Sequence, residues 1–285
     1  MSLLMSPLMT SIRLARRRSH LASAIAFAVV ALTTHAHIAS ADDEVPEGSR
    51  RARIPVWSIG LAGGFANRSF DYHIASGFAD VPDADGSASQ MVGVFGPTAS
   101  VAIDLDRVVL VGGTTLSVAK PITFEASLGV IGGLRTWTQY AEAISSEYVA
   151  PDVVEVEYQT YDVYYPTVFG LYGGAGVYTT SNTTGTGVDS FGYDTTVPVP
   201  GGTITTIEGG FGMAGRMSLI TAAAFDPIRQ AWGGRFRWRW VLGLGSNGVS
   251  LGTNIFAMSG GSASDPLPVV HLTIEVGYGD GPGIF

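Results

Sequence analysis

Apolar and polar residues alternate along most of this chain. From Trp57 to Phe65 the odd-numbered positions are mainly large and apolar, whereas the even-numbered positions carry Ser, Gly and Ala. The clearest example is RFRWRWVLGL (235–244), in which every second residue up to position 239 is arginine. A period of two places the two sets of side chains on opposite faces of a strand. No stretch after residue 41 shows the spacing of an amphipathic helix, so the pattern predicts an all-β protein.

Ten strands are predicted from this alternation. They cover residues 54–72, 88–105, 107–118, 121–140, 152–165, 167–180, 203–220, 234–246, 248–259 and 267–279. Several exceed the roughly 9–11 residues that a tilted transmembrane strand needs. Polar loops are expected at 73–87, 141–151 and 181–202. We therefore predict an antiparallel up-and-down transmembrane β-barrel of about ten strands, with eight as the alternative count. Because these three loops would not all lie at one end of a barrel, we also expect a misplaced strand boundary or connection.

The first 41 residues have the three parts of a secretory signal peptide. Four arginines between positions 13 and 18 precede an apolar run at 21–32, and a small-residue cleavage site follows at Ala39-Ser40-Ala41. The apolar run is shorter than the roughly 20 residues of a membrane-spanning helix. We expect residues 1–41 to be cleaved, residues 42–53 to form a polar lead-in, and residues 54–285 to form one barrel domain.

The composition excludes several classes of function. The chain has no cysteine, which rules out disulfides, zinc knuckles, iron–sulfur clusters and thiol catalysis. It has 16 basic residues, and the four that precede position 19 would leave with the signal peptide, so 12 would remain against 24 acidic residues. A net charge of −12 without a basic block argues against nucleic acid as a partner.

Alternation alone allows two kinds of barrel. A soluble barrel turns its apolar face inward, whereas an outer-membrane barrel turns it towards lipid and keeps a polar interior. A row of arginines on one strand and glutamates on others favours an interior salt-bridge network, and aromatic residues near the segment ends are typical of the girdles at a membrane interface. The candidate lumen residues are Arg235, Arg237, Arg239, His271, Glu275, Glu208 and Glu125. A structural ion-pair cluster or a solvated strand face is the first interpretation of the arginine row, and a pore constriction or anion site is the alternative.

On these features the chain resembles the outer-membrane β-barrel proteins of Gram-negative bacteria, in the broad sense of small porin-like and OmpA-like barrels. The matching features are the signal peptide, the alternating segments of 54–285, the final segment VVHLTIEVGY (269–278) and the terminal Phe285. The resemblance implies an outer-membrane location, contact with outer-membrane lipid, and recognition of the last strand and Phe285 by the barrel-assembly machinery. It implies no catalytic residue, and it leaves the oligomeric state open.

Residues suited to catalysis are scarce in the predicted mature chain. Its two histidines are His73 and His271. His271, Thr273 and Glu275 share one face of a strand, so a base, a hydroxyl and a carboxylate stand in a row. Neighbours two residues apart are separated by about 6.6 Å, which is too far for a direct hydrogen bond. Polar filling of the interior is therefore the preferred interpretation, and an outer-membrane acyl hydrolase is a lesser alternative.

The segment DVPDADGS brings three aspartates together. Asp80, Asp83 and Asp85 are weak candidates for a surface divalent-ion site, because an EF-hand loop would need a glutamate at position 94, which is valine. No cofactor or firm metal site is predicted. The expected function is a structural, adhesive or narrow-pore role in the outer membrane. The alternative is a soluble secreted or periplasmic barrel that binds an apolar ligand inside.

Overall fold

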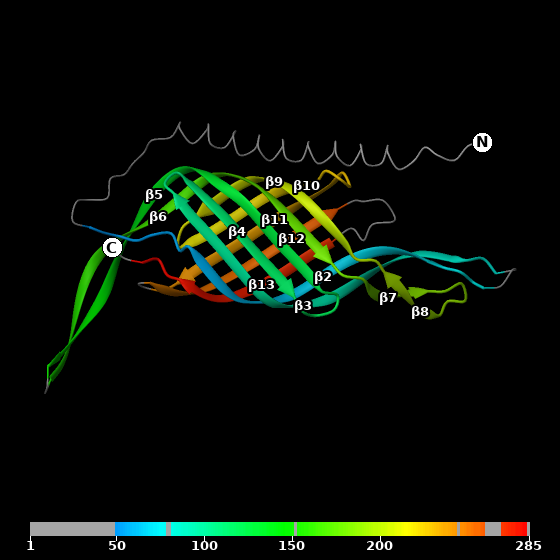
Figure 1. Cartoon of the computed structure of the whole chain (residues 1–285), viewed down its shortest axis with the longest axis horizontal. Helices are drawn as coiled ribbons and strands as arrows, with labels where there is room; N and C mark the ends of the chain where they lie inside the picture. Colours follow the sequence, from blue (N-terminus) through cyan, green and yellow to red (C-terminus); the bar gives the residue numbers. More distant parts are fainter. Residues whose placement is uncertain (1–48, 78–80, 151–152, 244–245, 260–268, 284–285) are drawn as a thin grey trace, which may run out of the picture.

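The computed structural model describes residues 49–77, 81–150, 153–243, 246–259 and 269–283, and all of its regular structure is β. Ten strands form a closed antiparallel barrel (Figure 1). They are β2 (Trp57–Ile74), β3 (Ala84–Leu105), β4 (Val108–Ser117), β5 (Thr123–Ala150), β6 (Val153–Thr180), β9 (Gly202–Ala214), β10 (Met217–Asp226), β11 (Ala231–Leu242), β12 (Asn247–Ser259) and β13 (Val269–Asp280). The predicted fold class and strand number are confirmed.

The barrel has up-and-down topology. Each strand pairs with the next barrel strand along the chain, and β2 closes the barrel by pairing with β13. Two short strands, β7 (Thr183–Val188) and β8 (Asp194–Val199), form a hairpin inserted between β6 and β9, which still pair with each other. A further short strand, β1 (Arg50–Arg51), lies parallel to β6.

The two ends of the barrel differ. The end at which β2 begins and β13 finishes, called here the terminal end, has two-residue turns at 106–107 and 215–216 and a short connection between β11 and β12. The opposite end, called the loop end, carries the 75–83 connection and the β7–β8 hairpin. Figure 1 shows β2, β3, β7 and β8 projecting together from the loop end, and the β5–β6 hairpin projecting from the terminal end.

Three predicted boundaries are wrong. The strands predicted at 152–165 and 167–180 are one strand, β6, over the described residues 153–180. Pro166 lies where β6 has no strand neighbour on one side, between its pairing with β1 at 163–164 and with β9 from 168. A proline is tolerated where a ladder does not need its missing N–H. Residues 203–220 contain two strands, separated by the turn Gly215-Arg216. The first error adds one strand to the predicted number and the second removes one, so the predicted number is still ten.

The third error is the loop predicted at 141–151. Residues 141–150 continue β5, and their backbone pairs with β6 beyond the barrel wall. The loops predicted at 73–87 and 181–202 both lie at the loop end, although strands occupy part of each. The mismatch noted in the sequence therefore has a structural explanation: the loop end carries the two long connections, and the terminal end carries one long β-hairpin.

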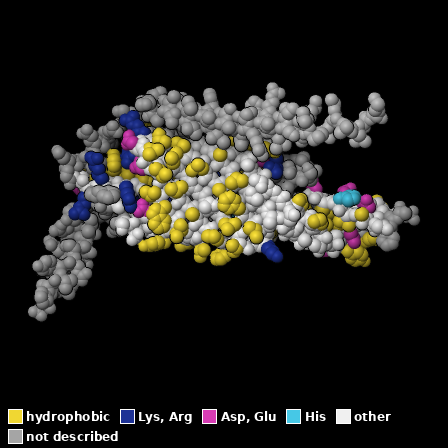
Figure 2. Space-filling view, viewed as in Figure 1, with side chains coloured by type: hydrophobic (Ala, Val, Ile, Leu, Met, Phe, Trp, Pro, Cys, Tyr) yellow, Lys and Arg dark blue, Asp and Glu magenta, His cyan; other side chains and the backbone are white. Residues whose placement is uncertain are grey.

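Large apolar side chains cover the outside of the barrel, and the inside holds charged and polar side chains together with apolar clusters. On β3 the exposed and buried positions alternate without interruption from Met91 to Thr98. On β11 Phe236 and Trp240 face outward, whereas Arg235 and Arg239 are buried. Figure 2 shows apolar side chains spread over the barrel wall, with charged side chains gathered towards the two ends of the molecule.

The terminal end is closed by a segment of chain that precedes the first barrel strand. Ala52 N–H donates to Tyr164 O of β6 at 2.9 Å, and Val56 N–H donates to the Asp280 carboxylate of β13 at 2.8 Å. Four barrel strands separate β6 from β13 on either side, so residues 52–56 form a strap across the opening. Arg53 pairs with Asp280 at 2.5 Å.

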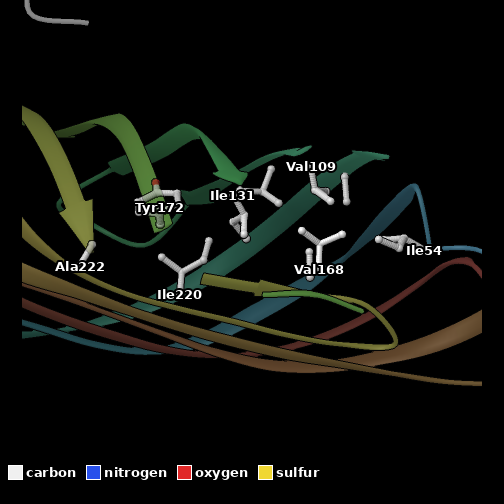
Figure 3. Packing of buried hydrophobic residues seen from close by; sticks show 10 residues of the cluster. Ile54, Val109, Ile131, Val168, Tyr172, Ile220 and Ala222 are labelled. Carbon is white, nitrogen blue, oxygen red and sulfur yellow. The ribbon is translucent and has the colours of Figure 1, made fainter. Parts of the chain in front are cut away.

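The strap also contributes to an apolar cluster inside the barrel. Ile54 is buried in it, together with Val109, Ile131, Val168 and Ile220 from four different strands. These side chains point towards one another in Figure 3. Ile54 precedes the first barrel strand, β2, and still contributes to the barrel interior.

Candidate functional site: the interior of the barrel

The seven candidate lumen residues all project to the inside of the barrel wall. Glu125 lies on β5, Glu208 on β9, the three arginines on β11, and His271 and Glu275 on β13. Five of them, Glu125, Glu208, Arg235, Arg239 and His271, are less than a tenth exposed. Alternation brings them inward because each occupies the face of its strand opposite to the apolar exterior residues.

The centre of the interior is an ion-pair network around Arg235. Arg235 Nε donates to both carboxylate oxygens of Glu208, at 2.9 and 3.0 Å, and Nη1 donates to Glu125 Oε1. Three strands separate β5 from β11 on one side of the barrel and five on the other. The Arg235–Glu125 pair therefore crosses the lumen instead of following the wall.

Glu125 and Glu208 are held by further side chains. Asn254 Nδ2 donates to Glu125 Oε1 at 2.9 Å, and His271 Nδ1 donates to Glu125 Oε2 at 2.6 Å. The hydroxyls of Tyr172 and Thr206 donate to Glu208 at 3.1 and 2.9 Å. Buried charges are stable only when they are paired and hydrogen-bonded in this way. The network links five strands besides β11, and it blocks the middle of the lumen.

Sequence reasoning missed several members of this interior. Asn254, Tyr172 and Tyr178 are buried beside the predicted residues, and Tyr178 packs on His271 with ring centroids 5.5 Å apart. Arg68 of β2 is fully buried and donates to Thr180 Oγ1 at 2.8 Å. All four lie on inward faces, so the alternation was sufficient to place them inside, but it contained no signal for which of them meet.

A second polar region lies nearer the terminal end. Arg239 Nη1 donates to the hydroxyls of Ser58, at 3.2 Å, and Ser100. Arg237 Nη1 donates to Ser127 Oγ at 3.4 Å, and its Nη2 lies 4.0 Å from Glu275 Oε1. Between these side chains and the apolar cluster is a cavity of about 30 Å³.

The row of His271, Thr273 and Glu275 is not assembled as a nucleophile site. His271 bonds Glu125 of the opposite wall, whereas Glu275 is nearest to Arg237. Thr273 is completely buried, and its hydroxyl has no hydrogen-bond partner among the described residues. A lipid substrate would have to enter the packed interior to reach it.

The acidic loop segment makes contacts of its own. Asp80 lies outside the described residues. Asp83 and Asp85 both face His73, whose Nε2 lies 3.4 Å from Asp83 and whose Nδ1 lies 2.7 Å from Asp85. Within the described ranges, no group of three or more His, Asp or Glu side chains is placed to hold a metal ion.

Comparison with known proteins gives no match: neither a family model, nor a curated protein, nor a solved structure resembles this chain significantly. In the part of the chain that the structure describes, no helix is long and apolar enough to cross a membrane. The predicted signal peptide and the terminal Phe285 lie outside the described residues.

Proposed function

We propose that this chain is an integral outer-membrane β-barrel, exported by its N-terminal signal peptide, which serves as a closed anchor for hairpins that project on both sides of the membrane. The observation that carries the proposal is the inside-out distribution of side chains. Large apolar residues cover the outside, including Leu61, Phe95, Leu128, Phe211 and Ile274, which are each more than half exposed. A charged network crosses the inside.

The height of the apolar surface fits a bilayer. On β13 the outward residues run from Val270 to Tyr278, and on β11 they run from Trp232 to Trp240. Eight residues extend about 26 Å along a strand, which becomes about 20 Å along the axis at a tilt of about 40°. That is close to the apolar band of about 25 Å on membrane barrels. Tryptophans stand at both ends of the β11 run, and Tyr278 stands at one end of the β13 run.

The interior favours an anchoring role over a diffusion pore. The strap closes the terminal end, and the network around Arg235 crosses the lumen. The loop end carries the longer connections, which face the outside of the cell in membrane barrels. There the β7–β8 hairpin exposes Val188, Phe191 and Tyr193, side chains that suit contact with another surface. We infer an adhesive or structural role for this projection.

The soluble alternative has less support. A barrel that binds an apolar ligand inside needs an open apolar cavity. The interior described here instead holds ion pairs, hydroxyls and a packed apolar cluster, and the cavity between them is small. The exterior would also expose large apolar side chains on most strands to water. An apolar surface of this extent is unusual on a soluble monomer.

The first experiment is fractionation of the native envelope, followed by gel migration of the detergent-extracted protein with and without heating. Recovery with the outer membrane, together with a heat-dependent shift in migration, is the expected result. Recovery in the soluble periplasmic fraction would overturn the proposal.

A pair of substitutions tests the lipid-facing surface directly. Ile274 lies midway along the outward run of β13, and Tyr278 lies at its end. In a bilayer, Ile274→Arg should lower the free energy of unfolding by about 2–4 kcal/mol, and Tyr278→Arg by about 0–1 kcal/mol. Urea unfolding in lipid vesicles measures both. Equal, small effects would indicate that this face meets water.

A further inference from the structure

The charges inside the barrel do not balance. Among the described residues the interior holds four arginines (68, 235, 237 and 239) and three glutamates (125, 208 and 275). Asp104, Asp226 and Asp280 are already paired with Arg135, Arg229 and Arg53. Counted over these arginines and glutamates, the interior carries one positive charge in excess. A buried cation without a counter-ion is costly.

Two interior arginines have no ion pair with a carboxylate among the described residues: Arg68, which donates to the hydroxyl of Thr180, and Arg239. Only Arg239 has a second arginine, Arg237, and a cavity beside it. Arg235 holds two carboxylates, and Arg237 faces Glu275 at 4.0 Å. Arg239 is only 8 % exposed, yet its hydrogen bonds within the described structure go to two serine hydroxyls. A hydroxyl accepts a hydrogen bond but neutralises no charge.

Arg237 and Arg239 line the same small cavity. The cavity lies between β3, β4 and β5 on one side and β10 and β11 on the other, and Ser100 and Ser218 also line it. Its remaining walls belong to apolar residues that include Ala102, Val111, Ile131 and Ile220. A volume of about 30 Å³ accommodates a water molecule or a particle of similar size.

The position of Arg237 depends on a glycine. A Cβ atom built on Gly113 of β4 would lie 2.1 Å from Nη2 of Arg237. The guanidinium group therefore rests against the β4 backbone, in space that any other residue at position 113 would occupy. Two guanidinium groups are thus brought to one cavity, with a single carboxylate near them.

We propose that this cavity binds a small inorganic anion of halide size, such as chloride, between Arg237, Arg239 and the serine hydroxyls. Guanidinium groups are strong donors to anions, and the anion would supply the negative charge that Arg239 lacks. A volume of about 30 Å³ suits a monatomic anion better than a phosphate ester or an organic acid. This site does not require that the barrel lie in a membrane.

Bromide provides a direct probe. Crystals of the full detergent-extracted protein, grown in bromide in place of chloride, should show an anomalous scattering peak between the guanidinium groups of Arg237 and Arg239. A cavity that holds only water, or bromide bound only on the outer surface, would overturn the proposal.

Unfolding gives a second test. At equal ionic strength, the urea midpoint of the unmodified protein should rise with chloride concentration and remain unchanged in gluconate, since an anion that binds the folded state stabilises it by mass action. Arg239→Gln should abolish the chloride dependence, whereas Lys120→Gln, which removes an exposed charge at the loop end, should retain it. Equal midpoints of the unmodified protein in both salts would contradict the site, and that comparison needs no variant to fold.

Discussion

Glu125 accepts hydrogen bonds from Arg235, Asn254 and His271, which come from three different strands across the lumen. Removal of one partner from a buried ion pair leaves the other charge uncompensated. This typically lowers the free energy of unfolding by about 3–5 kcal/mol. Since Arg235 also holds Glu208, we expect Glu125→Gln to lower the free energy of unfolding by about 3 kcal/mol. Urea unfolding followed by tryptophan fluorescence measures this change.

Asp71→Asn is the matched control for that substitution. Asp71 is an exposed carboxylate near the loop end, so its replacement should change stability by no more than about 0.5 kcal/mol. If the two variants unfolded at the same urea concentration, the network around Arg235 would not be a major source of stability.

His73 lies in the projection at the loop end, and its protonation should be coupled to the acidic loop. The hydrogen bond with Asp85 and the nearby negative charges raise the pKa of His73 above its ordinary value of 6.5. A raised pKa in the folded state means that the His73–Asp85 contact stabilises the loop at low pH, and that this contribution is lost as the pH rises through the raised pKa.

Proton NMR titration of the imidazole tests this expectation. The unmodified protein should titrate above 6.5, and Asp85→Asn should bring the pKa of His73 back towards 6.5 because it removes the largest cause of the shift. An unchanged pKa in the Asp85→Asn variant would show that the contact does not persist in solution.

For individual residues, the sequence predicted the strand face on which a side chain lies better than it predicted the residues that the side chain contacts. The alternation was sufficient to place Arg235, Glu125 and His271 on the inward faces of their strands. It contained no information about the bond between His271 and Glu125, because that contact depends on how the barrel closes. As the spacing predicted, His271 and Glu275 do not bond along the strand: they meet Glu125 and Arg237 of other strands.

At the level of elements, the β5–β6 hairpin extends beyond the barrel wall. Its backbone pairs over residues 141–150 and 153–162 without a third strand beside it. We expect that replacement of residues 142–161 by Asn-Gly, a sequence that favours a two-residue hairpin turn, will leave the barrel folded. Heat-dependent gel migration should be retained.

A deletion within the wall provides the control for the hairpin. Removal of the β4–β5 pair (108–132), which belongs to the ring of ten strands, should abolish the heat-dependent species. Loss of that species on shortening of the β5–β6 hairpin would instead show that the projection is needed for barrel formation.

The strand pattern was predictable because both faces of each strand have a distinct environment. Strand boundaries were less predictable where the local residues favour one structure and the pairing with neighbouring strands favours another. Pro166 looks like the end of a strand in the sequence. It is accommodated within β6 because β6 has no neighbouring strand on one side at this position. Gly215-Arg216 forms a tight turn within what reads as one continuous alternating run. Neighbouring strands, and not the local sequence, decided both positions.

At the scale of the whole molecule, the strap and the central network form two barriers in series. We expect vesicles that contain the purified protein to show no swelling in a solution of a small sugar, because the Arg235–Glu125 pair crosses the lumen. Vesicles that contain a general diffusion porin should swell in the same assay. Swelling with the protein itself would require that the network open in the membrane, and would support the narrow-pore role.

The seam between β2 and β13 has a consequence for the order of events during folding. Residue 67 pairs with residue 270, so the first barrel strand to be synthesised meets its second neighbour only when the last strand is complete. Contacts between such distant positions form slowly. Until then β2 presents an open edge that is able to pair with other chains. The nascent protein must therefore be kept apart from its copies until folding is complete, and the pairing of the final strand ends this vulnerable period.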